Sequence, residues 1–120
     1  MNKKLESTFL TEEQIASWKD EFKHVYQTGN GDTVIIYRPI RRSEYSKIML
    51  DTEIPREDEQ DDAKRAKRLM DRQTEICRTA VLYPENIDDE LEASAGLADN
   101  LSEEIMSHSG FGALKRTKEL

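Results

Sequence analysis

The chain has 120 residues, 36% of them charged and 36% hydrophobic, and its formal net charge is −7. This length suits one ordinary domain, and the acidic balance argues against a general affinity for nucleic acid or anionic lipid, because both attract positively charged surfaces. The single cysteine excludes an internal disulfide and a zinc site of paired cysteines, and the lack of a run of about 18 apolar residues predicts a soluble protein of a reducing cytoplasm with no membrane partner.

An N-terminal helix is predicted after a flexible segment, residues 1–10. Thr11 and Gln14 fit a capping box, in which each side chain satisfies a backbone donor of the first turn. The apolar stripe of this helix follows at spacings of three and four: Ile15, Trp18 and Phe22. The helix is expected to end near Lys23 and to dock on the body by that stripe.

A β-hairpin is predicted next, where the hydrophobic period changes. Thr33–Tyr37 is rich in β-branched and aromatic residues, and Asn30-Gly31 supplies residues that tolerate the positive φ of a hairpin turn. The flanking Gly29 and Asp32 leave the register open by about one residue. Since a two-stranded hairpin is marginal alone, it must pack on helices or join a partner's sheet.

A short helix and a linker are expected after Pro39, which cannot donate a ladder hydrogen bond and therefore ends the second strand. Ser43 is the predicted cap of a helix that runs to about Asp51. Its apolar side chains are Tyr45, Ile48 and Met49. Residues 52–60 contain a proline and a dense acidic patch, so we interpret them as a linker.

The longest helical signal extends from about Glu57 to Leu82, and Tyr83-Pro84 is expected to stop it. Charged residues crowd its first half, which should therefore be solvated. An apolar stripe strengthens towards the second half: Ala66, Leu69, Met70, Ile76, Cys77, Ala80 and Val81. This stripe predicts the centre of the core, where Ile76→Ala or Leu69→Ala would cost about 2–5 kcal/mol.

Two short helices are predicted in residues 84–104, which contain eight acidic residues and no Lys or Arg. Apolar residues keep a helical spacing there around an interruption at Gly96. Ser109-Gly110-Phe111 is typical of a glycine C-cap. Together the elements predict an α+β fold, a mostly helical small single domain with an N-terminal helix, one β-hairpin and a C-terminal helical part. The expected divisions are residues 11–52, residues 53–112 and a flexible basic tail, residues 113–120.

Several short motifs follow one another in an order that points to one family. They are Tyr37-Arg38-Pro39, Ser43-Glu44-Tyr45, the run from Cys77 to Pro84, the run from Leu101 to Ile105, and Ser109-Gly110-Phe111. With the capped first helix, they resemble small phage tail assembly chaperones over most of residues 11–112. The resemblance implies a protein without catalytic residues that binds the long, helical tape measure protein in the host cytoplasm, with tail-tube subunits as a further candidate client.

Two other functions stay open. The chain could be a structural or connector subunit retained in the mature virion, or a small phage regulatory protein that binds a host protein. For the chaperone, an amphipathic helix of the client would lie in a hydrophobic groove, and homo-oligomer formation is also open. The candidate partner contacts are the aromatic side chains of Tyr26, Tyr37, Tyr45 and Phe111.

No catalytic, cofactor or metal site is predicted. The two histidines, His24 and His108, lack the short spacing of a metal motif, even with Asp99 or Glu104 as a further ligand. Cys77 lies on the apolar stripe, where a free cysteine usually acts as a small buried hydrophobe.

Two further patterns resemble nucleotide or nucleic-acid sites. Gly29-Asn30-Gly31 is not followed by the Lys-Ser or Lys-Thr pair of a phosphate loop, so we interpret it as a turn. The basic residues of 64–68 and of 38–42 could touch nucleic acid. The acidic residues around them oppose that partner, and a solvated helix face explains the first cluster more simply.

Overall fold

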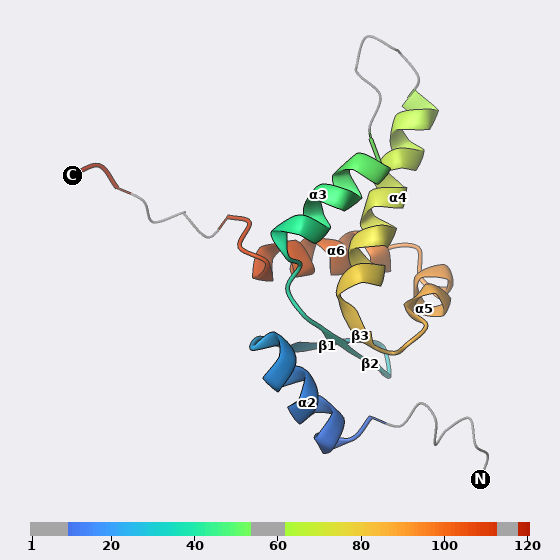
Figure 1. Cartoon of the computed structure of the whole chain (residues 1–120). Coiled ribbons are helices and arrows are strands. Elements are labelled where there is room, and N and C mark those ends of the chain that lie inside the picture. Colours follow the sequence, from blue (N-terminus) through green and yellow to red (C-terminus); the bar gives the residue numbers. More distant parts are fainter. Residues whose placement is uncertain (1–9, 54–61, 113–117) are drawn as a thin grey trace.

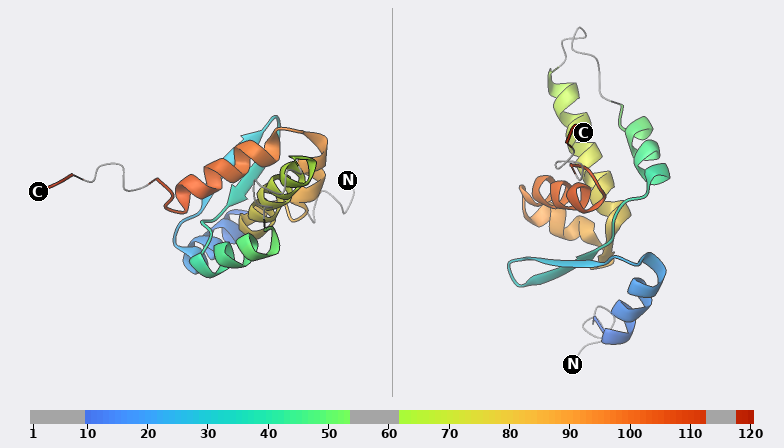
Figure 2. Two further views of the ribbon diagram at one scale, coloured as in Figure 1. Left: turned by 90° about the horizontal axis from the view of Figure 1, so that it is seen from above. Right: turned by 90° about the vertical axis from the view of Figure 1, so that its left-hand side faces the viewer.

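The computed structural model describes residues 10–53, 62–112 and 118–120. Within these residues the chain forms five α-helices and one antiparallel sheet of three strands in the order β1-β2-β3. Helices α4, α5 and α6 lie on one side of the sheet, and α2 lies on the other (Figures 1 and 2). The predicted α+β, mostly helical fold is confirmed.

Helix α2 (Glu12–Phe22) begins where its cap predicts. The Thr11 hydroxyl accepts a hydrogen bond from the Gln14 N–H at 3.1 Å, and the helix ends at Lys23, whose φ is 65°. No residue of α2 is fully buried, and its three apolar side chains are half-buried. The helix therefore docks by the predicted stripe, as an outer element rather than as part of the main core.

The hairpin consists of β1 (Tyr26–Asn30) and β2 (Thr33–Tyr37), with Asn30 paired to Thr33. The two turn residues are therefore Gly31 and Asp32, one position later than the predicted Asn30-Gly31 pair. Only Gly31 has a positive φ, 63°, which matches a type II′ turn with glycine first. The closing pair of the turn settles the register that the sequence left open.

Helix α3 (Arg42–Asp51) begins one residue before the predicted cap, Ser43. The carboxylate of Glu44 accepts a hydrogen bond from the Arg41 N–H at 2.9 Å, so the acid of the first turn supplies the N-terminal contact. The prediction of Ser43 as the cap is therefore wrong. Most of the predicted linker, and the predicted start of the long helix at Glu57, lie outside the described residues.

Helix α4 (Asp62–Ala80) ends two residues earlier than predicted because Val81 and Leu82, with the predicted stop residue Tyr83, form a strand, β3 (Val81–Tyr83). This strand pairs with β2, with Ile36 opposite Tyr83 and Tyr37 opposite Val81. The Arg38 N–H also donates to the Ala80 carbonyl at 3.0 Å. Residues that would otherwise continue the helix thus form backbone hydrogen bonds with the open edge of β2. Through this strand the second half of the chain joins the sheet of the first half.

The last two helices are α5 (Ile87–Ala93) and α6 (Leu97–His108), as the spacing predicts. The Phe111 N–H donates to the Met106 carbonyl at 3.2 Å, and the Gly110 N–H donates to the Ser107 carbonyl at 3.3 Å. With φ of 102° at Gly110, these bonds form a Schellman motif. The predicted glycine C-cap is confirmed. Residues 1–9 and 113–117, where the flexible ends were expected, are not among the described residues.

The core lies between the inner face of the sheet and helices α3 to α6. Its buried residues are Ile35, Tyr37, Ile40, Ile48, Ile76, Cys77, Ala80, Ile87, Leu101 and Ile105. Ile36 is also buried, and strand alternation turns it to the opposite face, where α2 lies. Three residues of the predicted core stripe are wrong, because Leu69 is 45% and Met70 is 65% exposed and Ala66 is exposed as well. These residues lie on the N-terminal half of α4, which extends past the other described helices and the sheet (Figure 1).

Candidate functional site

Tyr37, one of the four predicted partner contacts, is completely buried. Its hydroxyl donates to a Glu104 carboxylate oxygen at 2.8 Å and lies 2.6 Å from His108 Nδ1. Burial, reinforced by the Glu104 carboxylate, raises the pKa of Tyr37 above its ordinary value, so the hydroxyl stays protonated. The prediction of Tyr37 as a partner contact is therefore wrong, because the ring is part of the core.

Tyr26 belongs to the same cluster. Its ring stacks on His108 with centroids 4.0 Å apart and an interplanar angle of 5°, and it stacks on Tyr37 at 5.5 Å. These contacts hold the first strand against the end of α6. Tyr26 is half-buried, and the role that the structure gives it is to pack these two elements together.

Arg38, which the sequence places in a basic patch, is a structural hub. Its guanidinium makes two hydrogen bonds to the Glu44 carboxylate, at 2.7 and 2.8 Å, and a third to the Thr79 carbonyl at 2.9 Å. It also lies over the Phe22 ring at 5.0 Å. The hydrogen bond from Arg38 lowers the pKa of Glu44. One side chain thus joins the end of β2 to α2, α3 and α4, and no signal in the sequence identifies it.

Tyr45 and Phe111, the other two predicted contacts, come together. Their rings lie 4.9 Å apart at 50°, and Phe111 remains 47% exposed. They border a hollow of about 370 Å³ between the start of α3 and the end of α6. We call it the aromatic–arginine pocket, and its residues are Ile40, Arg41, Arg42, Tyr45, Ser109, Gly110 and Phe111.

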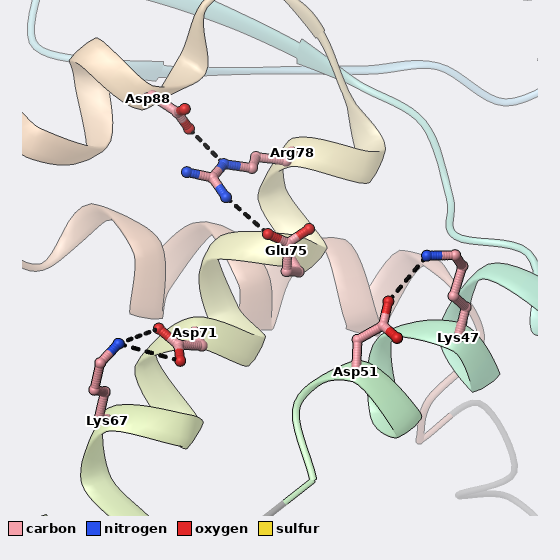
Figure 3. Close-up of polar contacts among 7 residues, drawn as sticks. All are labelled: Lys47, Asp51, Lys67, Asp71, Glu75, Arg78 and Asp88. Atoms are coloured by element: carbon pink, nitrogen blue, oxygen red, sulfur yellow. Dashed lines mark hydrogen bonds and ion pairs between the residues drawn. The ribbon is translucent and has the colours of Figure 1, made fainter. Parts of the chain in front are cut away.

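A larger hollow, of about 830 Å³, runs beside α4. We call it the α4 groove, and its residues are Asp51, Thr52, Arg68, Met70, Asp71, Thr74, Glu75, Arg78, Asp88, Leu91, Glu92, Ala95 and Ala98. Figure 3 shows the ion pairs along it. Arg78 bonds Glu75 on its own helix at 2.7 Å and Asp88 on α5 at 2.8 Å, so it ties the two walls together.

Other ion pairs near the α4 groove stay within one helix. Lys67 pairs with Asp71 at 3.3 Å, and Lys47 pairs with Asp51 at 2.9 Å. The sequence predicted neither the groove nor these pairs. A helical i,i+4 spacing of opposite charges is the one signal that could have found the last two.

Cys77 and the histidines do not form a reactive site. The thiol of Cys77 is buried in the core with its Sγ 3.9 Å from the Ala98 carbonyl oxygen, and burial raises its pKa to about 12. A thiol in this environment is protonated and shielded, which makes it a poor nucleophile. Both histidines are exposed: His108 stacks on Tyr26, and His24 lies beyond the end of α2.

Comparisons with known proteins give no relative: no family model matches the chain, and no curated protein or solved structure is significantly similar to it. None of the helices in the described ranges is both long and apolar enough to cross a lipid bilayer. Nor do three His, Cys, Asp or Glu side chains in those ranges gather as metal ligands would.

Proposed function

We propose that this protein is a phage tail assembly chaperone that binds helical segments of the tape measure protein in the host cytoplasm, with tail-tube subunits as a further client. The resemblance of its motifs to that family motivates the proposal. The observation that carries it is the exposed apolar surface at the N-terminal half of α4. A protein that shelters helices of another chain requires such a surface.

Leu69 and Met70 form this surface. Leu69 lies seven residues before the buried Ile76, which places the two side chains on the same face of α4, two turns apart. The core-facing stripe therefore continues beyond the buried core, where the described residues leave Leu69 45% and Met70 65% exposed. Ten residues of α4, from Asp62 to Asp71, correspond to about 15 Å of helix, which is enough for three turns of a client to pack alongside.

The α4 groove favours a helix over an extended peptide. Its apolar lining consists of Met70, Leu91, Ala95 and Ala98, and the small alanines allow close approach of a second helix. Charges of both signs border the groove, and several are already paired within the protein. The apolar contacts would therefore supply most of the affinity, while the charged rim would set orientation and encounter rate.

Co-expression with the tape measure protein of the same phage tests this proposal. Leu69→Glu and Met70→Glu should each lower the amount of co-purified client at least tenfold, because each places a charge in the apolar contact. Leu50→Glu is the matched control, since Leu50 is 79% exposed but lies on α3, away from the apolar surface that Leu69 and Met70 form on α4. If the wild-type protein retains no tape measure protein, or if all three variants retain equal amounts, the proposal is wrong.

Mass spectrometry of purified phage particles separates the alternatives. A chaperone that leaves after assembly should be absent from mature virions, whereas a structural or connector subunit should be present in stoichiometric amount. The remaining alternative, regulation of a host protein, predicts capture of one host protein by the wild-type chain in place of the tape measure protein. Loss of that capture at high salt would identify an electrostatic contact.

A further inference from the structure

The aromatic–arginine pocket is built by local structure that holds its shape before any ligand arrives. The Schellman motif at the end of α6 fixes the backbone of Gly110 and Phe111. Ser109 Oγ accepts a hydrogen bond from the Ile40 N–H at 2.8 Å and donates to the Ile105 carbonyl at 2.6 Å. These bonds attach the end of α6 to the segment that precedes α3. The two walls of the pocket are therefore fixed relative to each other.

The pocket combines an apolar floor with a positively charged rim. Tyr45 and Phe111 expose one side of their ring pair to the hollow, together with Ile40. Arg41 and Arg42 are the charged residues of the lining, and both are exposed. This sign is opposite to the net charge of −7 of the whole chain. A ligand that matches the pocket carries a bulky apolar group and nearby negative charges.

The two arginines remain available to a ligand. Arg42 makes no ion pair or hydrogen bond with the described residues, and Arg41 lies over the Phe22 ring at 5.8 Å. A cation–π contact leaves the N–H edges of a guanidinium open to carboxylates. The nearest acid in sequence, Glu44, is held by Arg38 and by the Arg41 N–H, and its carboxylate also attracts the Arg41 charge. One carboxylate cannot offset the three arginines Arg38, Arg41 and Arg42, so the rim keeps a net positive charge.

We propose that the aromatic–arginine pocket binds a short acidic peptide segment of a second partner protein, anchored by one aromatic or long aliphatic side chain. The anchor enters the hollow against Tyr45 and Phe111, and its flanking carboxylates pair with Arg41 and Arg42. A hollow of about 370 Å³ holds one large side chain rather than a whole helix. Two arginines beside an apolar floor also fit nucleic acid poorly, because its backbone needs an extended row of cations.

An NMR titration of the ¹⁵N-labelled chain with the peptide acetyl-Glu-Asp-Phe-Leu-Asp-Glu-amide tests the pocket directly. Shifts should concentrate on the amides of Arg42, Tyr45, Gly110 and Phe111. A peptide with Ala in place of Phe and Leu, and one with Lys in place of the four acids, should each bind at least tenfold more weakly. Equal binding of either control peptide, or shifts centred elsewhere, would overturn the proposal.

Two protein variants, each with a matched control, complete the test by fluorescence anisotropy with the same labelled peptide. Arg42→Glu should weaken binding at least tenfold, whereas Lys19→Glu makes the same change of charge on the exposed face of α2 and should leave affinity unchanged. Phe111→Ala should also weaken binding at least tenfold, and Leu50→Ala should not. Thermal melts confirm that each variant folds. If a single-stranded oligonucleotide binds more tightly than the peptide, and Arg42→Glu weakens that binding, the proposal of a protein partner is wrong.

Peptide binding at the aromatic–arginine pocket does not depend on client binding at the α4 groove. The aromatic–arginine pocket and the α4 groove share no residues, and their linings differ in charge. Loss of tape measure binding in Met70→Glu with unchanged peptide binding would therefore support both proposals. Failure at one surface leaves the result at the other interpretable.

Discussion

Replacement of Arg38 tests whether one side chain holds the elements of this fold together. In Arg38→Ala the carboxylate of Glu44 loses two charge-assisted hydrogen bonds, and the Thr79 carbonyl loses its donor. The Phe22 ring also loses the cation 5.0 Å above it, which weakens the attachment of α2. These groups lie on α2, α3 and α4, so the substitution affects all three helices.

The expected loss is about 3 kcal/mol. A carbonyl left without its donor costs about 1–3 kcal/mol, and a cation–π contact at a partly exposed site contributes about 0.5–1 kcal/mol. Breaking a fully buried ion pair costs about 3–5 kcal/mol, but the Glu44 side chain is 26% exposed and water can solvate its carboxylate after the change. The contributions share one guanidinium, so they add only in part.

Urea unfolding of Arg38→Ala, Glu44→Gln and the double variant measures both the loss and the coupling between the two side chains. We expect a coupling free energy of about 1–2 kcal/mol. The control is Lys47→Ala, which breaks the Lys47–Asp51 pair; both its side chains are more than half exposed, so the change should stay within about 0.5 kcal/mol. A loss below about 1 kcal/mol for Arg38→Ala would refute the claim that Arg38 joins the three helices. Arg38 would then be one residue of a basic surface patch.

Three further predictions concern stability and reactivity. Ile76→Ala should cost about 2–5 kcal/mol in thermal melts and Leu69→Ala less than about 1 kcal/mol, and equal losses would contradict the exposure of Leu69. The Cys77 thiol, whose pKa burial raises to about 12, should react with Ellman's reagent only after unfolding in urea; rapid reaction of the native protein would place it at the surface. The folded pKa of Glu44 is lowered chiefly by its hydrogen bond to Arg38, so its stabilisation should be full above the unfolded value near 4.5 and disappear as the pH falls through the lower folded pKa. Urea midpoints between pH 6 and about pH 3 should therefore fall further for the wild type than for Glu44→Gln, and equal falls would contradict the shift.

The sequence predicts best those features that depend on a few neighbouring residues. The Thr11 cap requires one hydroxyl three residues before a backbone donor, and the end of α6 requires a glycine at one position. Both are found where predicted. The start of α3 is different, because the acid of Glu44 and the serine at 43 are both plausible N-terminal partners, and local chemistry alone does not choose between them.

The errors arise where distant parts of the chain decide the outcome. Val81 continues the helical period of α4, but Tyr37, far away in sequence, offers the strand edge with which it pairs. Leu69 lies on the same face of α4 as Ile76, yet Ile76 is buried in the core and Leu69 is 45% exposed. Periodicity shows which face of a helix is apolar, whereas only the assembled fold shows how far that face is covered.

In the candidate site, too, local features are predictable from the sequence and long-range contacts are not. Aromatic side chains are readily selected from the sequence as contacts, but their roles depend on pairings across the fold. Tyr37 meets His108, 71 positions away, and becomes buried, whereas Tyr45 meets Phe111 at the edge and stays accessible. Residue type alone could not have separated these two tyrosines.

Helix α6 connects the two proposed binding surfaces. Ala98, in its first turn, lines the α4 groove, and Ser109 to Phe111, directly after its last turn, line the aromatic–arginine pocket. Twelve helical residues span about 18 Å, and Leu101 and Ile105 bury the middle of the helix in the core. The two ligands would therefore lie at opposite ends of one rigid element, without overlap, and each surface favours a different chemistry. Together the two proposals predict that a helical client binds at one end of α6 while an acidic segment of a second protein binds at the other.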